Sequence, residues 1–214
     1  MTAQSEFDER PLRGRRRAGR GEARRRQILD AAVRVIGTGG LASLTHRAVA
    51  EAAGVPLGSM TYYFRDREEL IDQTMAYAVE IERERMTGIV EEVTGEPTVD
   101  QSVDLLTTIF LDKSIADPLY DLALFEMFME ATRNPDLREK TIAWSDLIAG
   151  IVDRVLPPTD PALPRAMAIQ IVAALIDGLM LESASNQELT LEQLSEHLRA
   201  TIERLVAASE PSRS

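Results

Sequence analysis

Residues 44–64 bring together side chains that can hydrogen-bond to nucleic acid. Serine, threonine and tyrosine hydroxyls bind base edges or phosphate oxygens, and a glycine allows close approach of the backbone. A basic stretch precedes them, with nine Arg and a single acid, Glu22, between Arg10 and Arg26. Because arginines attract phosphates, the combination predicts a surface that contacts phosphates and bases.

Two short helices joined by a tight turn would present these side chains. Thr45 can cap a helix that reaches about Ala53, and Gly54 can adopt the positive φ of the turn. Pro56 suits the start of the next helix, which should end by Tyr63. Small residues are expected where the helices cross, at Ala48, Ala52 and Ala53. Four apolar residues should bury the pair against a preceding helix, namely Val49, Val55, Met60 and Phe64. This is the anatomy of a helix-turn-helix.

Helical periodicity covers most of the remaining chain, and no run alternates as a strand does. We expect a helix over residues 23–38, ended by Gly39 and Gly40, and a fourth helix from Asp66 to about Val93. Five further helices are expected at 98–115, 118–132, 135–156, 161–184 and 190–208. The sequence therefore predicts an all-α fold, in which a fourth helix joins an N-terminal three-helix helix-turn-helix domain to a larger C-terminal helical bundle.

Charge divides the chain into a basic end and an acidic remainder. Residues 1–75 hold 13 Arg against 10 Asp and Glu, a net charge of +3. Residues 76–214 hold 11 Lys and Arg against 25 Asp and Glu, a net charge of −14, so the whole chain carries −11. The basic end can meet phosphates, and DNA repels the remainder. We expect a disordered basic arm over 1–22, a helix-turn-helix domain over 23–70 and a larger helical domain over 71–214. The arginine cluster is either a solvated tail or an arm that follows phosphates or the minor groove, and we favour the arm.

Several classes of function are disfavoured by what the sequence lacks. It has no Cys and only two His, at positions 46 and 197, so we expect no disulfide, metal site or cofactor. A phosphate-cradling glycine loop and a Gly-x-Ser-x-Gly elbow are also absent, which argues against an enzyme. The longest apolar stretch, 166–181, is interrupted by Gln170 and Asp177, and no targeting segment is evident. We expect a soluble, cytoplasmic protein with no membrane partner.

The chain resembles the N-terminal domain of TetR/AcrR-family transcriptional regulators between Ile28 and Leu70. Two runs carry the resemblance, Thr-x-Arg-x-Val-Ala-Glu-Ala-Ala-Gly-Val from Thr45 and Gly-Ser-x-x-Tyr-Tyr-Phe from Gly58, followed by Arg-Glu-Glu-Leu from Arg67. The resemblance implies DNA contacts at Thr45, His46, Arg47, Gly58, Ser59, Thr61, Tyr62, Tyr63 and Arg67.

Side-chain chemistry distributes these contacts between phosphates and bases. Thr45 and Arg67 lie at expected helix N-termini, which suit phosphate, and Tyr63 can reach phosphate through its hydroxyl. The best candidates for base edges are Ser59, Thr61 and Tyr62. The family usually has Ser and Lys at positions 56 and 57, and often Tyr at 61, so Pro56, Leu57 and Thr61 make this surface particular to the chain. The three adjacent aromatic residues at 62–64 could instead belong to the core. We prefer that interpretation for Phe64 only.

For the C-terminal domain, the resemblance implies a ligand pocket and a homodimer built from its last two helices. Residues 166–181 are apolar on nearly every face, and 190–208 carry one apolar stripe, as such an interface requires. Candidate pocket residues are Phe110, Phe125, Phe128, Met129, Trp144, Ile148, Met167, Ile171 and Asp177. Each is alternatively a core residue. An acid among apolar neighbours, such as Glu126, Glu130 or Asp177, marks either a cationic ligand or an interhelical hydrogen bond.

We therefore predict a ligand-responsive transcriptional regulator, with repression as the default and activation as the alternative. It binds a pseudo-palindromic, double-stranded DNA operator as a dimer and is released by a small-molecule effector of unknown identity. Two alternatives are an enzyme, for which no catalytic set is assembled, and a helical adaptor that no longer binds DNA, which the apolar Leu57 keeps open.

Overall fold

The computed structural model describes residues 10–91, 93–112, 114, 117–186 and 188–206. The described part is helical throughout, apart from loops and one isolated bridge between Thr159 and Val206. The all-α prediction is therefore confirmed. Chain order begins with α1 (Arg10–Gly39), the 3-10 turn η1 (Leu41–Ser43), α2 (His46–Ala53) and α3 (Leu57–Tyr63).

The larger part of the molecule is built from six further helices. These are α4 (Arg67–Val90), α5 (Val99–Leu106), α6 (Pro118–Ala131), α7 (Arg138–Val155), α8 (Arg165–Ser185) and α9 (Leu191–Leu205). α5 continues as a π-helical turn, η2 (Thr107–Leu111), and the 3-10 turn η3 (Pro135–Leu137) leads into α7. Local signals fix where α5 and α9 begin, since Thr98 and Thr190 each form a capping box with the glutamine three residues later.

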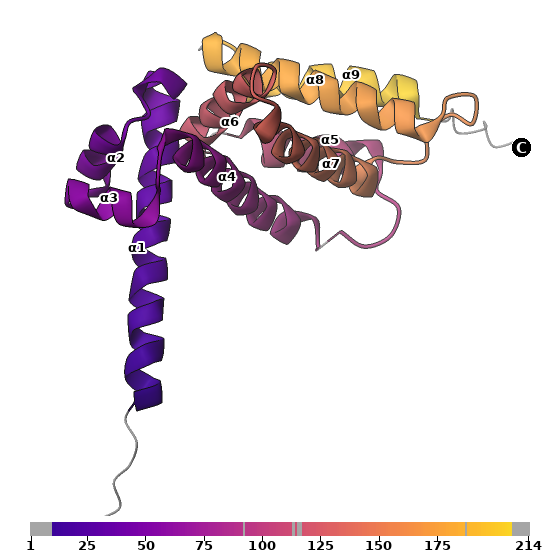
Figure 1. The fold of residues 1–214 in the computed structure, drawn as a ribbon. Coiled ribbons are helices and arrows are strands. Elements are labelled where there is room, and N and C mark those ends of the chain that lie inside the picture. Colours follow the sequence, from indigo (N-terminus) through magenta and orange to yellow (C-terminus); the bar gives the residue numbers. More distant parts are fainter. Residues whose placement is uncertain (1–9, 92, 113, 115–116, 187, 207–214) are drawn as a thin grey trace, which may run out of the picture.

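The first helix begins earlier than the sequence predicted. We expected a disordered arm over residues 1–22, but residues 10–22 continue α1, and residues 1–9 lie outside the described part. Arginine is a good helix former, and Pro11 lies in the first turn, where its missing N–H costs little. The basic half of α1 extends away from every other helix in Figure 1. The basic stretch is thus held on a helix.

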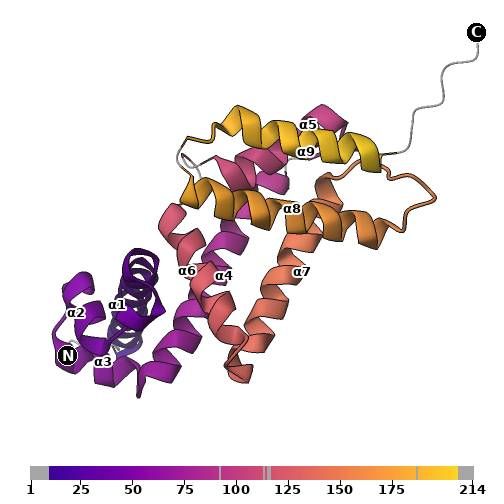
Figure 2. The same cartoon turned by 90° about the horizontal axis from the view of Figure 1, so that it is seen from above.

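The helices divide between two ends of the molecule. α1, α2 and α3 lie together at one end, and α8 and α9 run side by side at the other, as Figures 1 and 2 show. α4, α6 and α7 lie between them, and one continuous set of buried apolar residues runs from the first end to the second. A change at one end can therefore be transmitted to the other through packed helices.

α8 is the one helix in the described ranges that is long and apolar enough to cross a membrane by length and composition. Its two polar interruptions, Gln170 and Asp177, do not prevent this. Core helices of water-soluble proteins meet the same criterion, and α8 packs against α7 and α9. Its exposed apolar side chains include Met167, Ile171 and Leu181.

Candidate nucleic-acid interface and ligand pocket

The helix-turn-helix forms through the local interactions that its residue types favour. The Thr45 hydroxyl accepts a hydrogen bond from the Ala48 amide at 3.1 Å and so caps α2. Gly54 ends that helix with φ 62°, in the left-handed region. The four apolar residues expected to bury the pair, Val49, Val55, Met60 and Phe64, are all buried.

The small-residue face of α2 differs in part from the prediction. Ala53 is buried, and its carbonyl accepts a hydrogen bond from the Gln27 side chain of α1 at 2.8 Å. Ala48 is half-buried and Ala52 is exposed, whereas Ala50 takes a buried place. The helix is therefore rotated relative to our expectation, because α1 as well as α3 packs against it.

One face of α3 is free of other side chains. Tyr62 is 82% exposed, Leu57 is 52% exposed, and Thr61 also lies on the surface. A Cβ added at Gly58 would meet nothing within 4 Å, so the fold does not require glycine there. A ligand that approaches the backbone closely is a reason to keep it.

The three adjacent aromatics take different roles. Phe64 is fully buried, as predicted. Tyr63 is half-buried and meets the ring of Tyr62 edge to face, with centroids 5.0 Å apart. This contact orients the ring of Tyr62, which is the more exposed of the two tyrosines.

At the start of α2, Thr45 and Arg47 are exposed. His46 is half-buried, and its Nε2 atom is buried without a hydrogen-bond partner among the described residues. A phosphate contact from His46 would thus require its other ring nitrogen or its backbone amide. Ser59, which we also expect to contact DNA, is half-buried.

Arg67 has a structural role that the sequence did not reveal. Its Nε donates to the Leu44 carbonyl at 3.0 Å, and its Nη2 donates to the Leu41 carbonyl at 2.7 Å. Both carbonyls belong to the η1 region, which precedes α2. Arg67 therefore ties the start of α4 to the helix-turn-helix, and a DNA contact from it stays a prediction.

Replacing Arg67 by methionine should lower the free energy of unfolding by about 2 kcal/mol, because two charge-assisted hydrogen bonds to carbonyls disappear. Urea unfolding measures the change. Arg47→Met is the matched control, since Arg47 is exposed and hydrogen-bonds to no side chain or backbone group in the described part. Equal stabilities of the two variants would contradict the positioning role.

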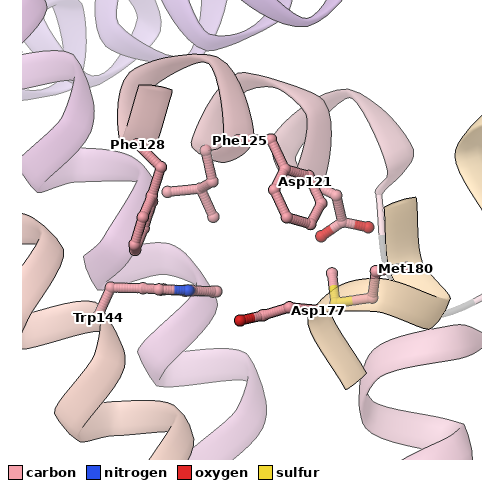
Figure 3. Close-up of a pocket in the computed structure, with 7 residues that line it drawn as sticks. Asp121, Phe125, Phe128, Trp144, Asp177 and Met180 are labelled. Carbon is pink, nitrogen blue, oxygen red and sulfur yellow. The ribbon is translucent and has the colours of Figure 1, made fainter. Parts of the chain in front are cut away.

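A pocket lies between α6, α7 and α8, with a volume of about 340 Å³, its open mouth included. Its walls are mainly aromatic and aliphatic, and two carboxyl groups face it, as Figure 3 shows. The lining residues are Asp121, Leu124, Phe125, Phe128, Trp144, Asp177 and Met180.

The structure brings four of the nine candidate pocket residues together, Phe125, Phe128, Trp144 and Asp177. Two others, Phe110 and Ile148, are buried in the core outside the lining. Met129, Met167 and Ile171 are exposed and do not line this pocket. Sequence reasoning missed Asp121, Leu124 and Met180. Residues 121, 124, 125 and 128 share one helix face, so this spacing around Phe125 was the available signal.

The acids marked by the sequence lie in different places. Glu126 accepts a hydrogen bond from the Leu41 amide at 3.2 Å, so it contacts the helix-turn-helix domain and lies outside the pocket. Glu130 pairs with Arg133 at 3.7 Å. The interhelical interpretation thus holds for Glu126, whereas Asp177 faces the pocket.

Burial shapes the protonation of both pocket carboxyls. Loss of solvent, followed by the nearby charge of Glu82, raises the pKa of Asp121 to about 7, although Arg85 opposes the shift. Burial also raises the pKa of Asp177. Glu82 and Arg85 form a buried ion pair at 2.6 Å on α4, and Arg85 donates to the Ile109 carbonyl at 2.9 Å.

The shifted pKa of Asp121 predicts a pH-dependent stability. The folded chain holds this proton more tightly than the unfolded chain, whose pKa is about 3.8. Stability should therefore fall as the pH rises from about 4 to about 7 and then level off. At roughly 1.4 kcal/mol per pKa unit, the total is at most ~4 kcal/mol.

An Asp121→Asn variant should lack this dependence, so its stability advantage over the parent protein should grow between pH 5 and pH 8. Urea unfolding at both pH values measures it. Asp146→Asn, on the exposed face of α7, is the control. An advantage that does not change with pH would be inconsistent with a perturbed Asp121.

α6 joins the pocket to the first domain. The Tyr120 hydroxyl donates to Asp30 of α1 at 2.7 Å, and Asp117 pairs with Arg34 of α1 at 3.2 Å. The turns of α6 that follow Tyr120 supply four of the pocket residues. Any ligand that displaces this helix must also disturb its contacts with α1 and η1.

Family models match both domains. One, of bacterial regulatory proteins of the tetR family, matches residues 28–74, and another, of the tetracyclin repressor-like C-terminal domain, matches residues 97–208. The second match alone covers more than half of the chain.

The chain belongs to the TetR family of transcriptional regulators.

Individual relatives agree with this assignment. This TetR-family chain is 27% identical over 198 residues to the transcriptional regulator BetI of Rhizobium meliloti, covering 86% of this chain and 94% of BetI. It is 32% identical over 112 residues to the nicotine-responsive transcriptional repressor HdnoR of Paenarthrobacter nicotinovorans. That match covers 52% of this chain and 56% of HdnoR, so it spans about half the length of this relative.

Solved structures share the same architecture. The multidrug binding protein EbrR, complexed with imidazole, superposes with a TM-score of 0.62 at 25% identity, covering 89% of this chain and 98% of EbrR. A TetR-family member from Streptomyces coelicolor A3 gives a TM-score of 0.64 at 25% identity, covering 86% and 99%. The protein is thus a regulator with a helix-turn-helix DNA-binding domain and a C-terminal ligand-binding domain, and it is not an enzyme.

Proposed function

We propose that this TetR-family regulator is a cytoplasmic repressor that binds a pseudo-palindromic operator as a homodimer and leaves it when a small-molecule effector binds. Members of the family are typically ligand-responsive repressors. HdnoR is described as nicotine-responsive, and EbrR has been solved with ethidium and with proflavin. We place the division between the DNA-binding and ligand-binding domains near residue 70.

The exposed face of α3 supports the DNA-binding role most directly. Thr61 and Tyr62 are surface residues on a helix that the fold leaves uncovered, and Thr45 and Arg47 are exposed at the start of α2. In a helix-turn-helix, the second helix enters the major groove and the first crosses the backbone. We assign base contacts to Ser59, Thr61 and Tyr62, and phosphate contacts to Thr45, His46, Arg47, Tyr63 and Arg67, with Gly58 permitting close approach.

An apolar surface on the last two helices supports the homodimer. Met167, Ile171 and Leu181 recur at helical intervals on α8 and are exposed, as is Leu191 on α9. Isologous pairing of two copies would remove this surface from water. The pair would then present two α3 helices to half-sites about 34–36 Å apart.

Effector release would act through α6. The helix carries pocket residues on one face, and Tyr120, Asp117 and Glu126 on it contact α1 and η1. A ligand that binds one position of α6 better than another shifts the equilibrium between them by its differential affinity. In the dimer, that shift would alter the separation of the two α3 helices.

DNA binding can be tested with duplexes from the region flanking the protein's own gene. We expect a specific complex whose affinity falls steeply with salt, since each neutralised phosphate adds roughly −0.9 to the slope of log K against log salt. Thr61→Ala and Tyr62→Ala should relax the sequence preference, with losses of about 1–3 kcal/mol each. Arg83→Ala, on α4, is a matched control for surface substitution.

Three results would count against the proposal. A slope near zero would refute a phosphate-dominated interface. Unchanged sequence preference in both α3 variants would show that other residues read the bases. Failure to bind any such duplex would instead favour an adaptor, the alternative that the exposed Leu57 supports.

A further inference from the structure

Two carboxyl groups face the same small apolar pocket from different helices. Asp121 projects from α6 and Asp177 from α8, and the rings of Phe125, Phe128 and Trp144 line the space beside them, as Figure 3 shows. Leu124 and Met180 complete the wall. None of the seven lining residues is basic.

Neither carboxyl has a structural partner that explains its position. Within the described ranges, no donor hydrogen-bonds to Asp121 or Asp177. The nearest cation to influence Asp121 is Arg85, which is already paired with Glu82 and bonded to the Ile109 carbonyl. Asp177 is exposed to solvent, but Asp121 is half-buried, and placing an acid in an apolar site without a partner costs free energy. Such a cost is expected where the missing partner is a ligand.

We propose that this pocket binds a small organic cation with an apolar, preferably aromatic, body. The two carboxylates supply the countercharge from two different helices, and the three aromatic rings contact the body and the cationic head. The proposal that the cation binds rests on the residues that line the pocket. The further proposal that this cation is the effector rests on the proposed function.

Different pocket residues would contact different parts of the cation. Asp121 on α6 is half-buried, whereas Asp177 on α8 is exposed. Trp144 and Phe128 line the pocket and can contact a cationic head through their rings, an interaction that strengthens when water is excluded. The enclosed part of the pocket is about 40 Å³, so we expect a compact ligand that extends into the open mouth.

Binding should depend on pH because the cation needs ionised carboxylates. Asp121 is faced by Glu82 and Arg85 on α4 and by Asp117 on its own helix. Burial raises the pKa of both pocket acids, so lowering the pH from 8 to 6 neutralises Asp121. We expect cation affinity to fall over this interval.

Trp144 provides a direct readout, because it is the only tryptophan in the chain and it lines the pocket. Its fluorescence is followed during titration of the full chain with phenyltrimethylammonium and with tert-butylbenzene, which has the same shape without the charge. We expect the cation to bind at least tenfold more tightly. Asp121→Asn and Asp177→Asn should each lower the affinity for the cation at least tenfold and leave the affinity for the neutral compound unchanged.

Asp146→Asn is the matched control, because it removes one negative charge from the exposed side of α7 and should change nothing. Equal affinity for the cation and its neutral isostere would overturn the proposal and leave an apolar pocket. No response of Trp144 to the cation at millimolar concentration, in a protein that unfolds cooperatively, would also overturn it.

Operator binding separates this inference from the proposed function. If the protein binds its operator but no organic cation, only the inference fails. If Trp144 reports selective cation binding but the cation does not release DNA, the pocket assignment holds and the effector role is wrong.

Discussion

A Gly37→Ala variant should unfold far more easily than the parent protein. Gly37 lies in α1, where alanine would ordinarily strengthen a helix by about 0.5–1 kcal/mol. A Cβ at this position would however lie 2.2 Å from the Leu119 carbonyl oxygen and 2.9 Å from its carbonyl carbon. These are backbone atoms at the start of α6, so no side-chain rotation relieves the clash. We expect a loss of about 3 kcal/mol in the free energy of unfolding.

Gly88→Ala is the control for this experiment. Gly88 lies inside α4, and an added Cβ there meets nothing within 4 Å, so the substitution should stabilise the protein. Thermal and urea unfolding of both variants measures the contrast. If Gly37→Ala were as stable as Gly88→Ala, α1 and α6 could not be packed as closely as the structure shows.

The same substitution also bears on signalling between the domains. A methyl group at Gly37 should push the start of α6 away from α1, close to the Asp117–Arg34 pair and the Tyr120–Asp30 hydrogen bond. In a Gly37→Ala protein that still folds, we expect operator affinity to respond less to any pocket ligand. Operator titrations with and without that ligand measure the response.

Replacing Arg85 by methionine should cost about 3–5 kcal/mol, because Glu82 would remain as a buried charge without a partner. Glu82 is 2% exposed, and Arg85 pairs with it at 2.6 Å. The nearby Asp121 carboxyl adds a second negative charge to the same region. Urea unfolding measures the loss, and lowering the pH below 7 should recover part of it by protonating the nearby Asp121.

α4 contains its own control for this prediction. Arg83 and Glu80 form an equivalent pair three residues apart, but both side chains are about half exposed. Arg83→Met should therefore change stability by less than about 1 kcal/mol. The double variant Glu82→Gln, Arg85→Met should recover most of the loss of the single one. Similar losses for Arg83→Met and Arg85→Met would contradict the importance of burial.

Local sequence signals were sufficient to predict the helix-turn-helix. Thr45 caps α2, Gly54 takes a positive φ, and Phe64 enters the core, all as expected, because each depends on neighbours within a few residues. Helix positions in the second domain were also close to prediction, since caps and prolines mark their ends. The start of α1 was not predicted correctly, because an arginine-rich run has helix propensity but lacks the apolar periodicity that reveals a packed helix.

Tertiary structure alone decided which side chains meet. The capping hydroxyl of Thr45 follows from sequence, but the hydrogen bonds from Arg67 to the carbonyls of Leu44 and Leu41 span 23 and 26 residues. The assignment of a DNA-facing surface to α3 follows from its family motif, yet which tyrosine is exposed depends on how α3 packs against α2.

The pocket shows the same division. Sequence identified Phe125, Phe128, Trp144 and Asp177, and it offered Met167 and Ile171 with equal justification, although these lie on the exposed face of α8. α6 and α8 are apolar on nearly all sides, so no stripe in the sequence indicates how each is rotated. Residue types determined that this chain forms apolar helices containing acids; the packing of those helices decided that Asp121 and Asp177 face one cavity, because rotation about a helix axis is fixed only by its neighbours.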